Sequence, residues 1–152
     1  MELHIGKTVL FASQKVAEDW TPCDGREIDM NNFDNMPLID VLMESTGSNN
    51  LPYLEDMNGI KYYIRTSNAP HPPGWDVDDI IGIVQAIKSS AAVPAHWILC
   101  DGKQLETSQY SQLFASIGTR FGGTPKGDFF NLPNLNSGTK RYIICYEGRF
   151  LG

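Results

Sequence analysis

The sequence predicts an α+β fold made of two small, loop-rich repeated domains, each with short strands and one helix. The hexapeptide Trp-x-x-Cys-Asp-Gly occurs twice, at residues 20–25 and 97–102, and further anchors flank both copies in the same order. Fourteen Gly and nine Pro among 152 residues indicate short elements joined by many turns. A repeat of this length favours two copies of a small domain over a solenoid.

The flanking anchors set the expected domain boundaries. An Ile-Gly pair opens each copy, a Leu-Pro pair follows the hexapeptide, and a β-rich run closes the copy at residues 61–64 and 141–144. We therefore expect a degenerate copy over residues 1–66, a linker rich in Pro, Gly and Asp over 67–80, and a second copy over 81–152. Because an isolated core of about seventy residues is marginal, we expect the halves to pack together or against other subunits.

The hexapeptide itself predicts a buried strand end followed by a tight turn. Asp accepts a local backbone hydrogen bond and Gly tolerates positive φ, so the pair reverses the chain at little steric cost. The aromatic residue before the turn is expected to anchor a small core. The predicted structural motif comprises Trp20, Cys23, Asp24, Gly25, Trp97, Cys100, Asp101, Gly102, Leu132, Pro133, Asn134 and Leu135.

In the first half, residues 3–11 predict a strand interrupted by Gly6, and residues 12–19 a loop. Proline cannot lie deep in a helix, so residues 33–36 are interpreted as a turn and Pro37 as the first helical residue. The helix is expected to reach about Ser45 and to bury Leu38, Val41 and Leu42. Residues 46–50 end it.

In the second half, residues 81–87 alternate as a strand does, with three isoleucines on one face. Thr107 or Ser108 is expected to cap a helix that Gly118 stops. The apolar face of that helix comprises Tyr110, Leu113, Phe114 and Ile117. A flexible loop over 120–125, an extended apolar segment over 129–135 and a last strand over 142–146 complete the half.

The net charge of −6 is unevenly distributed. Residues 1–76 hold five Lys/Arg against twelve Asp/Glu, whereas residues 77–152 hold seven against six. The acidic half argues against nonspecific nucleic-acid binding, which needs a basic surface. The asymmetry permits complementarity between neighbouring subunits, and a solvated acidic face is the alternative interpretation.

The three cysteines are expected to be reduced and buried. Cys23 and Cys100 occupy equivalent places in the repeat, and Cys145 lies in an apolar strand, which favours small buried hydrophobes over a disulfide or a nucleophile. Residues 1–10 lack the long apolar run of a signal peptide, and no segment approaches membrane-spanning length. These features predict a soluble protein made in a reducing cytoplasm, without membrane insertion.

The second half resembles a known family. After the Ile-Gly strand and the hexapeptide comes Tyr-x-x-Leu-Phe-x-x-Ile-Gly-x-x-Phe-Gly-Gly over residues 110–123, then Phe-Asn-Leu-Pro-Asn-Leu over 130–135 and Tyr-Ile-Ile over 142–144. This ordered set resembles the phage tail collar domain, which also occurs in bacterial microcystin-dependent proteins. The first half shares only the hexapeptide, Leu51-Pro52 and residues 61–64, and it lacks the Gly-Gly loop.

The resemblance implies a non-enzymatic structural component of a phage or phage-like tail, baseplate or fibre that contributes to host attachment. It implies a virion location after synthesis in the host cytoplasm, other tail or fibre proteins as partners, a trimer as the favoured oligomer, and no cofactor. A host surface glycan is a further expected partner. The alternative is a bacterial cell-surface adhesin or glycan-binding module, and an enzyme ranks third.

The sequence shows no constellation typical of catalysis. His4, His71 and His96 are isolated from one another and from any metal-ligand spacing. The loop at residues 122–127 resembles a phosphate-binding loop only superficially, because it lacks the Gly-Lys-Ser/Thr ending and follows a helix. In the Asn-rich segment 131–136, backbone pinning is favoured over a glycan contact that would involve Asn, Tyr53 or Arg120.

Several large apolar residues lie in segments that are interpreted as loops, which indicates an interface. The residues expected there are Trp75, Arg120, Phe121, Phe150 and Leu151, with Phe129 as a further apolar loop residue. The tail at residues 148–152 is expected to dock on a neighbouring subunit.

Overall fold

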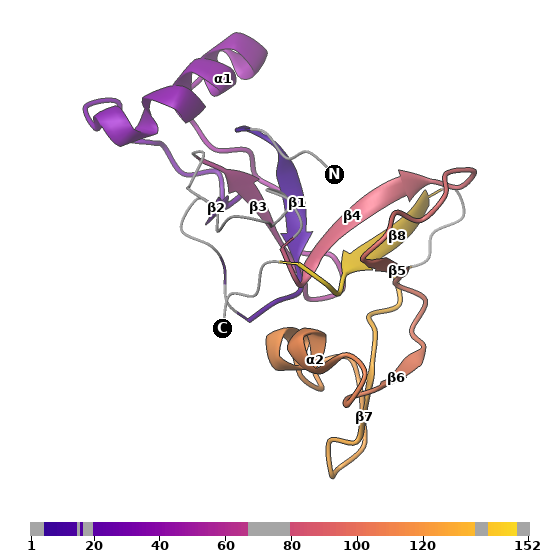
Figure 1. Ribbon diagram of the computed structural model, residues 1–152. Coiled ribbons are helices and arrows are strands. Elements are labelled where there is room, and N and C mark those ends of the chain that lie inside the picture. The colour runs from indigo at the N-terminus through magenta and orange to yellow at the C-terminus, as the bar shows by residue number, and fades with distance from the viewer. Residues whose placement is uncertain (1–4, 15, 17–19, 67–79, 136–139, 149–152) are drawn as a thin grey trace. The chain divides into compact units, whose positions relative to one another are not determined.

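The computed structural model describes residues 5–14, 16, 20–66, 80–135 and 140–148. The chain divides into two compact units (Figure 1). Unit 1 comprises Met1–Phe11 and Val16–Asp78, and unit 2 comprises Ala12–Lys15 and Asp79–Gly152. Each unit combines antiparallel strands with one α-helix, so the predicted α+β class is confirmed. The linker prediction lies outside the described residues except at Ile80.

The sheet of unit 1 is built around strand β3 (Lys61–Arg65). Strand β1 (Thr8–Phe11) pairs antiparallel with one edge of β3 and strand β2 (Trp20–Pro22) with the other. In this register Trp20 lies opposite Arg65. The predicted strand over residues 3–11 begins only at Thr8, because Gly6, at φ 88°, turns the chain before it.

The helical part of unit 1 consists of a 3-10 turn η1 (Phe33–Asn35) and helix α1 (Met36–Thr46). Pro37 lies in the first turn, as predicted, and Gly47 ends the helix in a left-handed conformation. The buried face holds Leu38, Ile39 and Leu42. Val41, which was predicted to be buried, is only half-buried, and Ile39 faces the core instead. These side chains pack with Cys23, Ile28, Leu51 and Ile64.

The sheet of unit 2 has the corresponding arrangement. Strand β8 (Lys140–Cys145) pairs antiparallel with β4 (Ile83–Lys88) on one edge and with β5 (Trp97–Leu99) on the other. Trp97 lies opposite Cys145. Ile81 is buried but precedes β4, so the predicted strand over 81–87 begins two residues late.

A two-stranded sheet and helix α2 (Ser111–Ile117) complete unit 2. Strand β6 (Gln104–Glu106) pairs with β7 (Phe129–Asn131), a pairing that was not predicted. The predicted cap at Thr107 or Ser108 is wrong, because the N-cap residue is Tyr110. The Thr107 hydroxyl instead donates to the Gly127 carbonyl (2.6 Å) and so fastens the loop before β7. Gly118 follows the last residue of the helix, as predicted.

A short segment from the first part of the sequence belongs to unit 2. The Ala12 amide donates to the Gly82 carbonyl (2.9 Å), and the Gln14 amide donates to the Ser116 carbonyl (2.8 Å). A Cβ atom on Gly82 would lie 2.7 Å from the Ser13 Cβ, and Gly82 has φ 96°. We call residues 12–14 the strap. The prediction of a simple loop over 12–19 missed these hydrogen bonds.

No helix within the described residues has the length and hydropathy needed to cross a membrane.

Candidate functional site

The Asp-Gly turn of unit 2 is held by backbone hydrogen bonds on both sides. The Cys100 amide donates to the Tyr142 carbonyl (2.8 Å), and the Leu135 amide donates to the Cys100 carbonyl (3.1 Å). The Asp101 carboxylate accepts from the Lys103 amide (3.1 Å), which closes the turn. Gly102 has φ 80°, and a Cβ atom there would lie 3.1 Å from the Asn134 Cβ. The turn is therefore fastened between β8 and the segment that follows β7.

The Asp-Gly turn of unit 1 has the same hydrogen bonds at the corresponding positions. The Cys23 amide donates to the Tyr62 carbonyl (3.0 Å), and the Leu54 amide donates to the Cys23 carbonyl (3.1 Å). Gly25 has φ 79°, and a Cβ atom there would lie 3.3 Å from the Tyr53 Cβ. The two hexapeptides thus form the same local structure, although Tyr53 stands where unit 2 has Asn.

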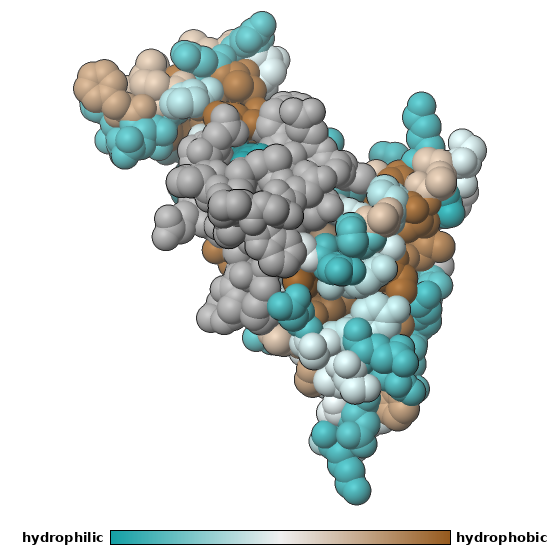
Figure 2. Space-filling view, viewed as in Figure 1, coloured by the Kyte–Doolittle hydropathy of each residue, from teal (hydrophilic) through white to brown (hydrophobic). Residues whose placement is uncertain are grey.

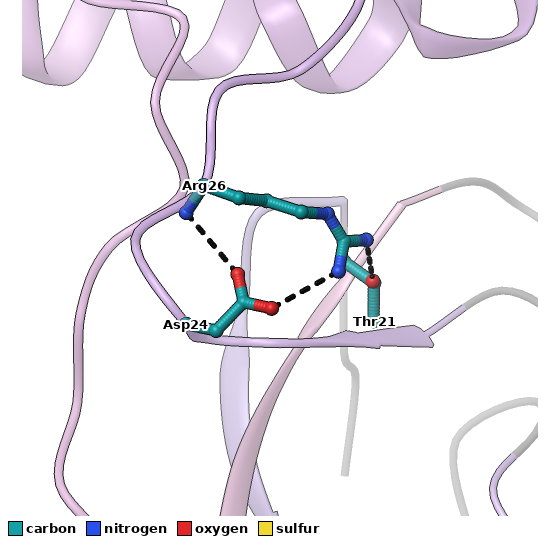
Figure 3. Close-up of polar contacts among 3 residues, drawn as sticks. All are labelled: Thr21, Asp24 and Arg26. Carbon is teal, nitrogen blue, oxygen red and sulfur yellow. Dashed lines mark hydrogen bonds and ion pairs between the residues drawn. The ribbon is translucent and has the colours of Figure 1, made fainter.

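The side chains around the first turn form a small surface network (Figure 3). Asp24 accepts from the Arg26 amide (3.1 Å) and forms an ion pair with the Arg26 guanidinium (3.1 Å). The second guanidinium nitrogen donates to the Thr21 hydroxyl (2.5 Å). The Asp24 carboxylate is therefore engaged in holding the turn. Since these groups are exposed, the ion pair contributes little to stability.

The motif residues divide into buried apolar side chains and exposed polar ones. Trp20 and Trp97 are buried at the starts of β2 and β5, with 6% and 4% of their surface exposed. The Asp residues and Asn134 lie at the surface. The apolar motif residues Cys23, Cys100, Leu132, Pro133 and Leu135 are buried. The predicted burial of both tryptophans is confirmed.

All three cysteines are free and buried, as predicted. Burial raises the pKa of the Cys100 thiol to about 12, with a further contribution from the Asp101 charge. Burial and then the Asp24 charge raise the pKa of the Cys23 thiol to about 11. Because the thiolate is the reactive form, neither of these two thiols is activated as a nucleophile at neutral pH. In the described part of the chain, no group of three or more His, Cys, Asp or Glu residues is placed to hold a metal ion.

The expected interface residues fall in different environments. Trp75, Phe150 and Leu151 lie outside the described residues, as does most of the C-terminal tail. Arg120 is exposed, and its guanidinium donates to the Ala12 carbonyl (2.8 Å) and stacks on the Phe121 ring at 5.2 Å. Phe121 and Phe129 are half-buried. Arg120 therefore helps to hold the strap. The sequence gave no indication of this role.

The exposed apolar side chains lie mainly around α1, where the sequence did not lead us to expect them. Phe33 is 88% exposed, and Met30, Met36 and Met43 are also exposed. Figure 2 shows hydrophobic and hydrophilic surface interspersed over the α1 end of unit 1. The stretch over residues 27–60 contains seven Asp/Glu and no Lys, Arg or His. This run of acidic residues was the feature of the sequence that could have marked the surface around α1 as unusual.

Among the described residues, shallow grooves lie within single units, and three of them bear on the site. One is lined by Tyr53, Asp24, Glu55, Asp56, Lys61 and their neighbours, with a volume of about 350 Å³. A second, of about 510 Å³, is lined by Ala86, Ile87, Lys88, Ser89, Ser90 and Lys140. The third lies on the Gly-Gly loop and includes Phe114, Gly123 and Lys126. The first two combine apolar or aromatic groups with charge.

Comparison with known proteins agrees with the resemblance inferred from the motifs. No curated protein and no solved structure matches the chain. Residues 82–139 match the family model of the Phage Tail Collar Domain. The match includes the second hexapeptide, α2, the Gly-Gly loop and β7. The resemblance recognised from the sequence is confirmed for this part of the chain by the family match, which suggests a structural role in a phage tail or fibre.

Proposed function

We propose that the protein is a non-enzymatic structural subunit of a phage or phage-like tail, baseplate or fibre. The match of residues 82–139 to the collar family carries this proposal. The motif side chains support it, because Asp24 and Asp101 bind backbone amides of their own turns and the Cys23 and Cys100 thiols are buried. These groups stabilise turns, so the family motif serves the fold. The subunit works in the virion tail with other tail or fibre proteins and as an oligomer, for which a trimer is favoured.

We also propose that the chain is a tandem of two collar-like domains, with a degenerate copy over residues 1–66. The matching hydrogen bonds of Cys23 and Cys100 support this proposal. A second correspondence is an isolated β-bridge between Glu27 and Asn50 in unit 1. It occupies the place that the β6–β7 pair has in unit 2. Unit 1 retains a helix after its Asp-Gly turn but lacks the Gly-Gly loop. Any contact made by that loop is then confined to unit 2.

The structural role is tested in the particle. Phage particles purified by density gradient are digested and analysed by mass spectrometry, and gold-labelled antibodies against the chain locate it by electron microscopy. We expect peptides of the chain at a fixed stoichiometry to the major tail proteins, with label on the tail. An absence from particles that are infectious and complete in their other tail proteins would contradict the proposal.

Glycan binding is a second candidate function, favoured by the groove at Tyr53. This side chain is 71% exposed beside Glu55 and Asp56, and an aromatic face with carboxylate acceptors suits a sugar ring. Isothermal titration with host surface polysaccharide tests it. We expect Tyr53→Ala to abolish binding and Tyr142→Ala, a substitution in unit 2, to retain it. Equal binding by Tyr53→Ala and the unmodified chain would exclude this groove.

A further inference from the structure

The exposed apolar side chains are concentrated at one place in the fold. Five large hydrophobic side chains are exposed among the described residues, and four of them lie in η1, in α1 or within three residues before η1. These four are Met30, Phe33, Met36 and Met43. Exposed apolar groups that cluster in this way are typical of interaction sites. We call these four residues, with the exposed acidic residues Asp34, Asp40 and Glu44, the η1–α1 face.

The turn that carries Phe33 is held in place by hydrogen bonds. The Asp34 amide donates to the Asn32 side chain (3.0 Å), and the Asn35 amide donates to the Asn32 carbonyl (3.0 Å). The Asn35 side chain donates to the Asp29 carbonyl (3.0 Å), so the chain before η1 is tied to the start of α1. These bonds fix the position of a ring that is 88% exposed. A side chain that is preorganised in this way loses less conformational freedom when a partner binds.

The aromatic residues at the helix of unit 2 are arranged differently. Tyr110, the N-cap residue of α2, packs edge-to-face against Tyr146 with the ring centroids 5.3 Å apart. Phe114, inside α2, contacts Phe130 at 5.4 Å. Phe33 has no ring contact within the described residues. Unit 2 therefore packs both of its aromatic side chains, whereas unit 1 leaves its own at the surface.

The η1–α1 face carries negative charge. Neither η1 nor α1 contains a basic residue. Asp40 and Glu44 lie four residues apart in α1, so their carboxylates project from the same side of the helix. Met36 and Met43 have spacings of four and seven from these two residues or from each other, which places them on that side as well. Within the described part of the chain, neither carboxylate forms an ion pair.

The basic residues of unit 1 lie outside this face. Those that the structure describes are Lys7, Arg26, Lys61 and Arg65. Arg26 pairs with Asp24, Arg65 is buried, and Lys61 lines the groove at Tyr53. Lys7 follows Gly6, where a Cβ atom would lie 2.6 Å from the Val41 side chain. Val41 lies about 140–160° around the helix from the two methionines, so unit 1 does not neutralise the charge beside them.

We propose that the η1–α1 face binds another protein of the tail, at an apolar pocket that is bordered by Lys or Arg side chains. Phe33 fills the pocket, and Met36 and Met43 pack around it, since methionine adapts to irregular surfaces. Asp40 and Glu44 pair with the basic border of the pocket. The assignment of the partner to the tail rests on the proposed function.

The charge of the face decides against the other occupants. A second copy of the chain that used the same face would place its carboxylates opposite Asp34, Asp40 and Glu44, and like charges repel each other. An anionic membrane surface or a nucleic acid would be repelled for the same reason. A protein surface that combines an apolar pocket with positive charge is attracted by both components of the face.

Photo-crosslinking in assembled particles tests this contact. p-Benzoylphenylalanine replaces Phe33 in the full-length chain, the purified particles are irradiated, and crosslinked peptides are identified by mass spectrometry. We expect crosslinks to one site on a different tail protein. The same replacement of Tyr53 is the control, because Tyr53 is 71% exposed in unit 1 but lies outside the η1–α1 face, and it should not crosslink to that site.

The purified partner is then titrated with the full-length chain by isothermal titration calorimetry. Phe33→Ala, and separately Asp40→Lys with Glu44→Lys, should each weaken binding at least about tenfold, and the charge reversal should also reduce the dependence of binding on salt. Glu55→Lys with Asp56→Lys is the matched control, since it makes the same charge change in unit 1 outside η1 and α1 and should bind like the unmodified chain. All the substituted side chains are exposed, and circular dichroism checks that each variant is folded.

Three outcomes would overturn the proposal: no crosslink from position 33 in particles that contain the chain, a crosslink to a second copy of the chain, or variants that bind the partner as tightly as the unmodified chain. The outcome for the proposed function is separate. A chain that is present in the tail without the crosslink contradicts only this contact. A chain that is missing from complete, infectious particles contradicts the tail role, and with it the identity of the partner.

Discussion

Trp97 occupies the first position of β5, where it is buried opposite Cys145. Its burial could be predicted because a large apolar side chain before an Asp-Gly turn has few alternatives in a small domain. The same reasoning placed Trp20 and the three cysteines inside the protein. It gave no indication that Phe33 would be exposed, because a single aromatic residue between polar neighbours has no periodicity that assigns it to a face.

We expect Trp97→Ala to lower the free energy of unfolding of unit 2 by about 3–5 kcal/mol, through lost burial and a residual cavity. Urea denaturation followed by circular dichroism measures the change. Trp97→Phe is the control, because it retains most of the apolar volume and should lose clearly less. A loss under about 1 kcal/mol for Trp97→Ala would show that this side chain is not a core anchor.

We expect the stability of the protein to fall in alkali partly because of Cys100. Its thiol has a pKa of about 12 in the folded protein, raised by burial and then by Asp101, against 9.0 for an unperturbed thiol. The unfolded chain therefore releases this proton first. The stability contributed by the neutral thiol is complete below pH 9 and is lost as the pH rises toward 12.

Denaturant midpoints measured across this pH range for the unmodified chain and for Cys100→Ala test the alkaline prediction. The difference between their unfolding free energies should change with pH by at most about 1.4 kcal/mol per unit. Parallel curves for the two proteins would contradict the burial-induced shift.

At the scale of elements, the helices and the central strands β3 and β8 were predictable, but the residues that pair with each strand were not. Pro37 and Gly47 mark the ends of α1 through their own backbone preferences. The β6–β7 pair was missed because strands of three residues carry no alternation and these two lie far apart in the sequence. The strap was missed for a related reason, since its hydrogen bonds join residues that local sequence does not connect.

We expect Gly82→Ala to destabilise unit 2 by about 1–3 kcal/mol, because the residue combines a positive φ with close approach to the strap. Gly59→Ala is the matched control: Gly59 has φ 80°, but no atom lies within 4 Å of its Cβ position. The two substitutions share the backbone cost, so their difference measures the steric contact. Equal losses in thermal or urea unfolding would show that the strap yields without cost.

At the scale of the whole molecule, the chain order does not coincide with the two units. Residues 12–14 precede Trp20 in the sequence but bond to Gly82 and Ser116 in unit 2. The charge is divided as well, with the acidic excess of residues 27–60 in unit 1 and the groove lined in part by Lys88 and Lys140 in unit 2. A cut at residue 66 or 80 would therefore remove a part of unit 2.

We expect the amides of Ala12 and Gln14 to exchange hydrogen together with unit 2. Trp97→Ala should lower their protection, because it destabilises the unit that holds their acceptors. Trp20→Ala is the matched control in unit 1 and should leave their protection higher than Trp97→Ala does. Hydrogen exchange followed by nuclear magnetic resonance measures both. Loss of protection in Trp20→Ala alone would assign the strap to unit 1.

The sequence by itself determined the α+β class, the buried hexapeptide anchors, the ends of α1 and the resemblance to the collar family, because turn residues, prolines, glycines and large apolar groups act through local preferences. The tertiary structure alone decided which residues lie opposite one another. It placed Lys88 beside Lys140, held the strap against Gly82, and turned Met36 and Met43 outward beside Asp40 and Glu44. Those outcomes depend on the strand register and on which side of α1 faces the core. Both are set by contacts between residues that are distant in the sequence, so local sequence could not predict them.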